Sequence, residues 1–358
     1  MKNKINHYIP SGCSTAGVIS VDRELVSGEI ISRMIARMHQ RANGLGGGFA
    51  GYGIYPNHED EYAFHIMYEN EKGKSDCEEF IEKNTNVLHK EEIPTRPVDV
   101  ILNRPILCRY FVKIKNDVKN KYYDMTQEDI IMFLVMEINS SIVGAFVFSS
   151  GKNMGIFKGV GYPEDIAKFY RLEEYKAYMW TAHGRFPTNT PGWWGGAHPF
   201  GLLDWSLVHN GEISSYGANK RYLEEFGYKL TLHTDSEAIL YALDLLVRKH
   251  NLDFKTAAIA LAPPLWDEIK NNDKKELLTA IRAIYGGAML NGPSAIIISW
   301  NGGMMGLNDR VKLRPLVAGR KNNKCYLSSE ECAIREVEKE LDELKYVPAG
   351  TPVIFKLK

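Results

Sequence analysis

The stretch IPSGCSTAGVIS, residues 9–20, contains the first predicted strand of the fold and the cysteine that precedes it. Cys13 stands between a short polar leader and a run of small and β-branched residues, which favours a buried strand from residue 14 onward. A cysteine in this position can pack as a small hydrophobic residue, carry a lipid anchor or act as a nucleophile. The rest of the sequence is needed to decide among these three roles.

The composition is that of an ordinary globular protein with balanced charge. Of 358 residues, 44% are hydrophobic, and 44 Lys and Arg residues offset 44 Asp and Glu residues. Binding to nucleic acid or to a membrane surface needs excess positive charge. We therefore expect neither partner, and the chain is long enough for one large domain with a buried active site.

The five cysteines do not follow a known structural pattern. Their number is odd and no C-x-x-C spacing occurs, which argues against disulfide bonds, zinc ribbons and iron–sulfur ligation. The leader MKNKINHYIPSG lacks the apolar core of a secretory signal, and no apolar stretch approaches the roughly 20 residues of a membrane span. We expect a cytoplasmic protein with reduced thiols, which weakens the lipid-anchor role for Cys13.

Strands and helices are predicted in a mixed order. A helix is expected from Asp22 to about Arg41, and the glycine-rich stretch 44–56 that follows indicates backbone packed closely against other groups or positive φ angles. Further strands are expected at 61–70, 108–115, 144–150, 294–300, 324–329 and 351–358. Further helices are expected at 126–141, with Thr126 as an N-cap, around 253–284, with an interruption at Pro263 and Pro264, and at 333–345. Because strands and helices do not alternate strictly, we predict an α+β fold in one domain, with an insertion at about 70–160.

Three short stretches concentrate residues that could perform chemistry: HGRFPTNTPGWW at 183–194, LVHNGEI at 207–213 and HTDSEAI at 233–239. Each lies where a predicted strand meets a loop or a helix. Loops held by rigid elements are where binding and catalytic residues usually lie.

Each stretch has an ordinary structural interpretation beside a functional one. Arg185 could form a surface ion pair, or it could grip a carboxylate through two parallel N–H bonds. Asn210 and Gly211 could form a plain turn, or their amides could form an oxyanion hole. Thr234 or Asp235 could cap a helix, or Asp235 could face a substrate ammonium. In their functional roles, Arg185 and Asp235 would bind the two charges of an α-amino acid.

The chain resembles the class II glutamine amidotransferases, a branch of the N-terminal nucleophile hydrolases. The stretches RFPTNTPGWWGGAHPF and LVHNGEI are most similar to the amidotransferase portion of glutamate synthase, and the likeness continues through GLNDRVKLRPLVAG at 306–319. It covers nearly the whole chain after Cys13. The sequence departs from the family pattern at Gly184 and His198, where glutamine is usual.

The resemblance implies a fold, a site and a processing step. The fold is a four-layer α/β/β/α sandwich, formed by residues 13–358 after removal of a propeptide, residues 1–12. Cys13 would be the nucleophile, with Asn210 and Gly211 holding the oxyanion. Arg185 would bind the α-carboxylate of the substrate and Asp235 its α-ammonium. The other residues assigned to substrate binding are Thr188, His198 and Arg41.

The leader matters because a thiol needs a base. A free thiol has a pKa near 8.5, so only a few per cent is thiolate at pH 7. If the chain begins at Cys13, the α-amine of that residue has a pKa of about 7.7–8.0 and can accept the proton. With the leader attached, the same nitrogen is an amide without basicity. We therefore expect cleavage between Gly12 and Cys13.

The resemblance also implies a partner. No P-loop, Rossmann, flavin or iron–sulfur pattern is recognised in the chain, so we expect no cofactor here and a separate subunit that uses the ammonia. In a split glutamate synthase that subunit would carry FMN and an iron–sulfur cluster and would aminate 2-oxoglutarate. Two alternatives remain at this point: an independent amidohydrolase of the same superfamily, and a non-catalytic regulatory subunit that keeps the leader.

Overall fold

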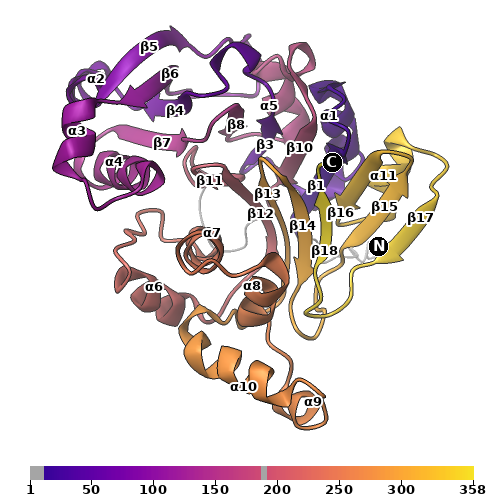
Figure 1. Ribbon diagram of the computed structural model, residues 1–358. Helices are drawn as coiled ribbons and strands as arrows, with labels where there is room; N and C mark the ends of the chain where they lie inside the picture. The colour runs from indigo at the N-terminus through magenta and orange to yellow at the C-terminus, as the bar shows by residue number, and fades with distance from the viewer. Residues whose placement is uncertain (1–11, 187–191) are drawn as a thin grey trace, which may run out of the picture.

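Two sheets pack against each other at the centre of the molecule (Figure 1). The computed structural model describes residues 12–186 and 192–358. The larger sheet has seven strands, all antiparallel, in the order β17 (Glu343–Tyr346), β15 (Val317–Lys321), β16 (Lys324–Ser328), β1 (Ser14–Ser20), β10 (Met179–Gly184), β3 (Gly47–Tyr52) and β8 (Met154–Gly159). The strand predicted after Cys13 is thus confirmed as β1, near the middle of this sheet.

The second sheet has five antiparallel strands, in the order β11 (Phe200–Leu202), β12 (Trp205–Gly211), β13 (Ser294–Trp300), β14 (Gly303–Asn308) and β18 (Val353–Lys356). Its strands β12, β13 and β14 lie against β1 of the larger sheet. The interface between the sheets is apolar because both sheets turn hydrophobic side chains inward.

Helices cover both outer faces. The larger sheet is covered by α1 (Gly28–Ala36), α5 (Pro163–Phe169) and α11 (Glu331–Val337). On the other side, α7 (Asp235–Asp244) packs on β11 and β12 and against α6 (Tyr216–Glu224). Farther along the chain, α10 (Lys275–Ile284) packs against α8 (Phe254–Leu261) and α9 (Trp266–Lys270). The predicted α+β class and the four α/β/β/α layers are confirmed.

A third sheet stands at one end of the molecule (Figure 1). Its four antiparallel strands are ordered β5 (Thr85–Glu92), β6 (Ile106–Ile114), β4 (Tyr62–Tyr68) and β7 (Ala145–Ser149), accompanied by α2 (Glu71–Asn84), α3 (Asn116–Lys121) and α4 (Gln127–Ser141). Thr126 caps α4 as predicted. The segment 70–160 falls largely on this sheet, although β4 begins earlier and β8 belongs to the seven-stranded sheet.

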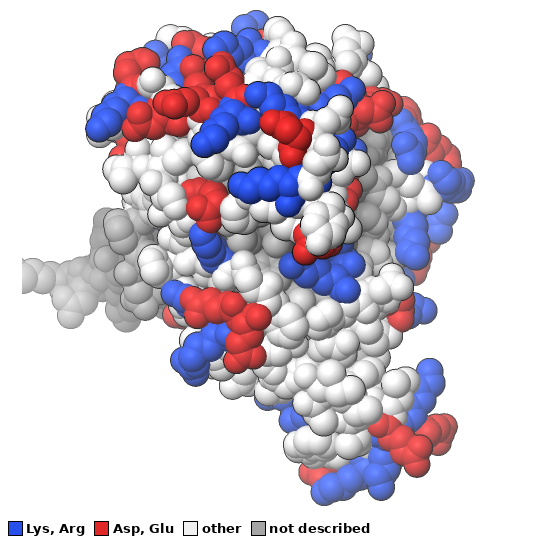
Figure 2. All heavy atoms as spheres, turned by 60° about the vertical axis from the view of Figure 1, so that its left-hand side comes forward, with Lys and Arg blue, Asp and Glu red and all other residues white. Residues whose placement is uncertain are grey.

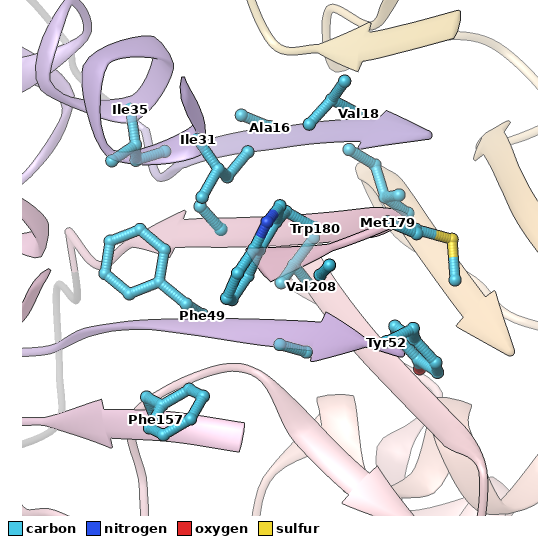
Figure 3. Close-up of a cluster of buried hydrophobic side chains, with 14 of the residues drawn as sticks. Ala16, Val18, Ile31, Ile35, Phe49, Tyr52, Phe157, Met179, Trp180 and Val208 are labelled. Carbon is cyan, nitrogen blue, oxygen red and sulfur yellow. The ribbon is translucent and has the colours of Figure 1, made fainter. Parts of the chain in front are cut away.

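The core of the larger sheet is built from side chains of several layers (Figure 3). Trp180 of β10 is completely buried, and its indole N–H donates to the carbonyl of Val26 at 3.1 Å. Around it lie side chains from α1, β1, β3, β8, β10 and β12, including Ile31, Ala16, Phe49, Phe157, Met179 and Val208. This packing fixes the strands whose ends form the candidate site.

The glycine-rich stretch forms β3, and the close approach predicted for it is confirmed. A Cβ placed on Gly48 would lie 2.4 Å from the carbonyl oxygen of His198, and one on Gly51 would lie 2.5 Å from the ring of Trp180. Gly44, outside the strand, has a φ of 77°. Both explanations offered for the glycines therefore apply.

Two helix predictions were wrong in extent. Val26 and Ser27 pair with residues 176–177 as the short strands β2 (Val26–Ser27) and β9 (Lys176–Ala177), and Ser27 caps α1, which therefore begins at Gly28 rather than near Asp22. The charged stretch 333–345 is helical only to Val337. Its end pairs with β15 as the edge strand β17, because Leu344 packs against the core there.

The surface carries both signs of charge. Figure 2 shows Lys and Arg side chains interspersed with Asp and Glu on the face in view, without a large field of one sign. Among the described residues, no helix is long and apolar enough to cross a membrane.

Candidate active site

A cavity of about 540 Å³ lies where β1, β10 and β12 approach one another, and Cys13 forms part of its wall. Its lining includes six of the eight residues predicted from sequence: Cys13, Arg185, His198, Asn210, Gly211 and Asp235. Arg41 contacts Cys13 from outside this lining, and Thr188 lies outside the described residues. Stretches far apart in the sequence thus line one cavity together with Cys13.

Cys13 immediately precedes β1. Its Sγ accepts a hydrogen bond from the backbone N–H of Phe186 at 3.3 Å. Burial raises the pKa of the Cys13 thiol, while the Phe186 amide and the Arg185 guanidinium partly oppose that effect. With Gly12 still joined to it, the sulfur is therefore mainly protonated at neutral pH and needs a base.

Arg41 holds the backbone at Cys13. Its Nη2 and Nε donate to the Cys13 carbonyl at 3.2 and 3.4 Å, and its Nη1 pairs with Glu330 at 2.9 Å. The guanidinium therefore ties the first residue of the predicted mature chain to the C-terminal part of the fold. Arg41 thus contacts the backbone of the predicted nucleophile rather than the cavity.

Arg185 follows β10 directly. Its backbone N–H donates to the Gly46 carbonyl at 2.8 Å, and its side chain lines the cavity beside Cys13. Burial lowers the pKa of Arg185, against an opposing effect of the Cys13 sulfur. A guanidinium remains charged in such a place, so it can meet a carboxylate and also favours a thiolate.

Asn210 and Gly211 do not form a turn. They end strand β12, paired with Ala295 and Ser294 of β13. Asn210 is 1% exposed, and neither its Oδ1 nor its Nδ2 has a hydrogen-bond partner among the described residues. A buried amide without partners costs about 1–3 kcal/mol, so it points to a group that arrives with the substrate.

Gly211 has a φ of 153°, and a Cβ at this position would lie 2.0 Å from the carbonyl oxygen of Pro293. Only glycine fits here without displacing backbone. The side chain of Asn210 also lies close to Gly12, since a Cβ on Gly12 would lie 3.1 Å from Asn210 Oδ1. The Gly12–Cys13 junction therefore lies beside the predicted oxyanion donors.

Asp235 is the first residue of α7, and Thr234 is the N-cap, since its hydroxyl accepts from the Ser236 N–H at 3.4 Å. The capping explanation therefore belongs to Thr234. Asp235 Oδ2 accepts from the Ile213 N–H at 2.8 Å, which orients the carboxylate on the cavity wall.

The lining also contains polar residues to which the sequence assigned no role in the site, among them Ser236, His209 and Arg314. His198 Nε2 lies 2.8 Å from Ser236 Oγ, and His209 Nδ1 lies 3.0 Å from the same oxygen. Arg314 lowers the pKa of the Cys13 thiol, and its buried Nε has no partner among the described residues. The available signal for Arg314 was its place in the stretch 306–319. Ser236 sat beside Asp235 without a distinguishing spacing.

A larger cavity, about 870 Å³, lies beside the first one and shares Trp193 and Leu232 with it. Its lining comes mainly from the third sheet and its neighbouring loops and contains neither cysteine nor histidine. The thiol of Cys13 lies in the lining of the smaller cavity, together with Arg185, Arg314 and Asp235.

Comparison with known proteins gives a family match. The model of the family described as "Glutamine amidotransferases class-II" matches residues 57–350. A protein of Archaeoglobus fulgidus described as "Uncharacterized protein" is 50% identical over 97% of this chain and 92% of its own length. A "Putative glutamine amidotransferase" of Methanothermobacter thermautotrophicus is 25% identical over 96% of this chain and 100% of its own length.

The likeness to glutamate synthase is more distant. The Bacillus subtilis protein described as "Glutamate synthase [NADPH] large chain" is 28% identical over 54% of this chain but over only 14% of its own length. Most of that large chain therefore has no counterpart in the match.

Proposed function

This chain belongs to the class II glutamine amidotransferases, and we propose that it hydrolyses L-glutamine to glutamate and ammonia with Cys13 as nucleophile. The observation that carries this proposal is the cavity in which the Cys13 thiol meets Arg185, Asp235 and the buried amide of Asn210. A nucleophile, two groups suited to the charges of an α-amino acid and an oxyanion donor are the parts that amide hydrolysis requires.

The first half of the reaction forms a thioester. Arg185 binds the α-carboxylate, Asp235 binds the α-ammonium, and the side-chain amide carbon lies at Cys13 Sγ. The sulfur attacks that carbon while its proton passes to the α-amine of Cys13. Asn210 and the N–H of Gly211 stabilise the oxyanion. The α-amine then returns the proton to the leaving nitrogen, and ammonia departs.

The second half restores the enzyme. Water attacks the thioester carbonyl, and the α-amine of Cys13 accepts its proton. The carbon–sulfur bond breaks, the thiol is regenerated and glutamate leaves. One glutamine and one water thereby give one glutamate and one ammonia.

Removal of residues 1–12 is part of the proposal. In the unprocessed chain, the nitrogen of Cys13 is a peptide amide, and burial raises the thiol pKa. Gly12 also lies in the lining of the cavity, next to the side chain of Asn210. Cleavage at Gly12–Cys13 frees the base and the space beside the oxyanion donors together.

For the ammonia we propose a separate acceptor subunit of the glutamate synthase type, which aminates 2-oxoglutarate and carries FMN and an iron–sulfur cluster itself. The quoted motifs and the partial match to a glutamate synthase large chain support this choice. The relative that matches over its full length is described as a "Putative glutamine amidotransferase", which supports the amidotransferase half of this proposal.

The activity is tested by measuring ammonia released from L-glutamine by the processed chain, with L-asparagine as a comparison amide. We expect release from glutamine, and its loss in Cys13→Ser but not in Cys332→Ser, a half-buried cysteine outside the lining. Glutamine left intact by the processed enzyme, with another amide hydrolysed, would favour an independent amidohydrolase instead.

The partner is tested by affinity capture from native extract. Co-purification with a flavin-bearing synthase chain would support the proposed acceptor. Capture of a phosphosugar-using or nucleotide-using enzyme would contradict it, while leaving the glutaminase activity untouched.

A further inference from the structure

A buried chain of hydrogen bonds runs behind the carboxylate of Asp235. At its centre is Ser236, whose Oγ lies 2.8 Å from His198 Nε2, 3.0 Å from His209 Nδ1 and 3.3 Å from Asp235 Oδ1. Ser236 is 1% exposed, His209 2% and His198 7%. These four side chains come from the loop before β11, from β12 and from the start of α7.

The positions of the protons follow from counting partners. His198 Nδ1 and His209 Nε2 are buried without a hydrogen-bond partner among the described residues. An orphaned buried N–H is rarer than an orphaned lone pair, so each ring carries its proton on the nitrogen that faces Ser236. Both imidazoles then donate to Ser236 Oγ, which uses its two lone pairs.

The hydroxyl proton of Ser236 has one acceptor left. With both imidazoles donating, the acceptor among these contacts is Asp235 Oδ1 at 3.3 Å. The other carboxylate oxygen, Oδ2, already accepts from the Ile213 N–H at 2.8 Å. The Thr234 hydroxyl also donates to Oδ1, at 3.3 Å. Asp235 is therefore held from both sides, by the backbone at Oδ2 and by the hydroxyls of Ser236 and Thr234 at Oδ1.

The imidazole rings of His198 and His209 each carry one proton, as this hydrogen-bond arrangement requires. Burial lowers the pKa of His198, reinforced by the neighbouring rings of His183 and His209 and by the cations Arg185 and Lys158. Burial likewise lowers the pKa of His209, opposed by Asp235 and Glu212 and reinforced by Arg314. Both imidazoles are neutral near pH 7, so each has one donor and one acceptor nitrogen.

Helix capping does not explain this arrangement. The cap of α7 is the Thr234 hydroxyl, and the Ser236 backbone N–H is its donor. The Ser236 hydroxyl is thus free of the capping role and points into the cluster formed with the two histidines.

We infer that Ser236, backed by His198 and His209, is a positioning residue that aims the Asp235 carboxylate at the α-ammonium of the substrate. The inference rests on the proposed function, since it assumes that Asp235 binds this ammonium. It also explains why histidine can stand at position 198: its Nε2–H supplies one of the two donors that turn the serine proton toward Asp235.

The first test compares two amides that differ at one group. L-Glutamine and 4-carbamoylbutanoate have the same side chain, but the second lacks the α-amino group. We expect Ser236→Ala to lower the ratio of their kcat/KM values by about tenfold, which corresponds to about 1.4 kcal/mol, because a hydrogen bond to a charged group is lost. The change should appear mainly as a higher KM for glutamine.

Two further variants frame this result. Asp235→Asn should lose the discrimination more completely, and Ser299→Ala, which removes another buried hydroxyl in the part of β13 away from Asn210, should keep it. A discrimination ratio in Ser236→Ala equal to that of the wild type would overturn the positioning role. So would a wild-type enzyme that hydrolyses both amides equally well.

The second test does not depend on activity. ¹⁵N NMR of histidine-labelled protein, assigned with the variant His198→Gln, should show His198 protonated at Nε2 and His209 at Nδ1. Ser236→Ala should shift both resonances. The opposite tautomers would overturn the inference even if the protein proved inactive toward glutamine, whereas inactivity alone would count against the proposed function.

Discussion

The reactivity of Cys13 is proposed to depend on its backbone nitrogen, which is a peptide amide while the leader is attached and an amine after cleavage. Its thiol is buried beside Arg185 and Arg314, and both cations favour the thiolate, yet burial outweighs them and raises the pKa. A neighbouring base is then required, and the proposed base is the residue's own nitrogen. The residues around it can be tested one at a time.

Asn210 is predicted to act on the transition state. Asn210→Ala should lower kcat for glutamine by about 10²–10³-fold and leave KM nearly unchanged, because an oxyanion donor acts where charge develops. Steady-state kinetics on the processed enzyme measure this. A variant that raised KM alone would show that the Asn210 side chain binds the ground state instead.

Arg314 is predicted to tune the thiol. In Arg314→Gln the loss of a nearby positive charge should raise the pKa of Cys13 further, so alkylation of Cys13 by iodoacetamide near pH 7 should slow by about three- to tenfold. Peptide mass mapping separates Cys13 from the other thiols. Arg320→Gln, on the exposed part of β15, serves as the control, and equal rates in both variants would refute the role.

At the level of elements, the site depends on strand ends. β1, β10 and β12 deliver Cys13, Arg185 and Asn210 to one cavity, and the backbone of β3 lies close behind them. The glycines of β3 allow this, because Gly48 lies directly under the carbonyl of His198.

Gly48→Ala is therefore predicted to disturb both stability and the site. The added Cβ would lie 2.4 Å from His198 O and 2.7 Å from Phe157 O, and both are backbone atoms that cannot simply rotate away. Overpacking of this kind costs about 1–3 kcal/mol of unfolding free energy. Urea unfolding measures it, with Gly286→Ala as the control because its Cβ would meet nothing within 4 Å. Equal stability of the two variants would contradict the account of β3.

Sequence reasoning found elements and residues where a local signal was strong. The strand after Cys13, the helix capped by Thr126 and the motifs around Arg185, Asn210 and Asp235 each combine a typical residue with a typical spacing. The start of α1 and the strand β17 were missed because tertiary pairing decided them. Ser236 was missed because its role depends on two histidines that are distant in the sequence.

Over the whole molecule, two buried ionisable side chains connect the loops around the site. Lys158 donates to the carbonyl of Gly195 at 2.9 Å, and Glu237 accepts from the backbone N–H groups of Thr231 and Leu232 at 3.1 and 3.0 Å. Burial lowers the pKa of Lys158 to about 7 and raises that of Glu237 to about 7. The loops that contain Gly195 and Thr231 also contribute residues to the cavity linings. Changes at Lys158 or Glu237 should therefore affect both the stability of the fold and the shape of the site.

The pH dependence of stability follows from these directions. The pKa of Glu237 is raised from 4.5 to about 7, so the folded state favours the protonated carboxyl. Its contribution to the unfolding free energy is complete below pH 4.5 and is lost as the pH rises through about 7. Its stability slope is at most about 1.4 kcal/mol per pH unit. Glu237→Gln should flatten the fall in unfolding free energy between pH 5 and 7, while the exposed Glu79→Gln should not. Urea titrations at several pH values decide this, and an unchanged slope in Glu237→Gln would contradict it.

The most direct measurement joins intact-mass analysis to activity on a single preparation. Enzyme that releases ammonia from glutamine should have the mass of a chain that begins at Cys13. A variant that cannot be cleaved between Gly12 and Cys13 should keep its leader and stay inactive. Full activity in molecules that still carry Met1 to Gly12 would contradict the claim that the amine of Cys13 is the catalytic base.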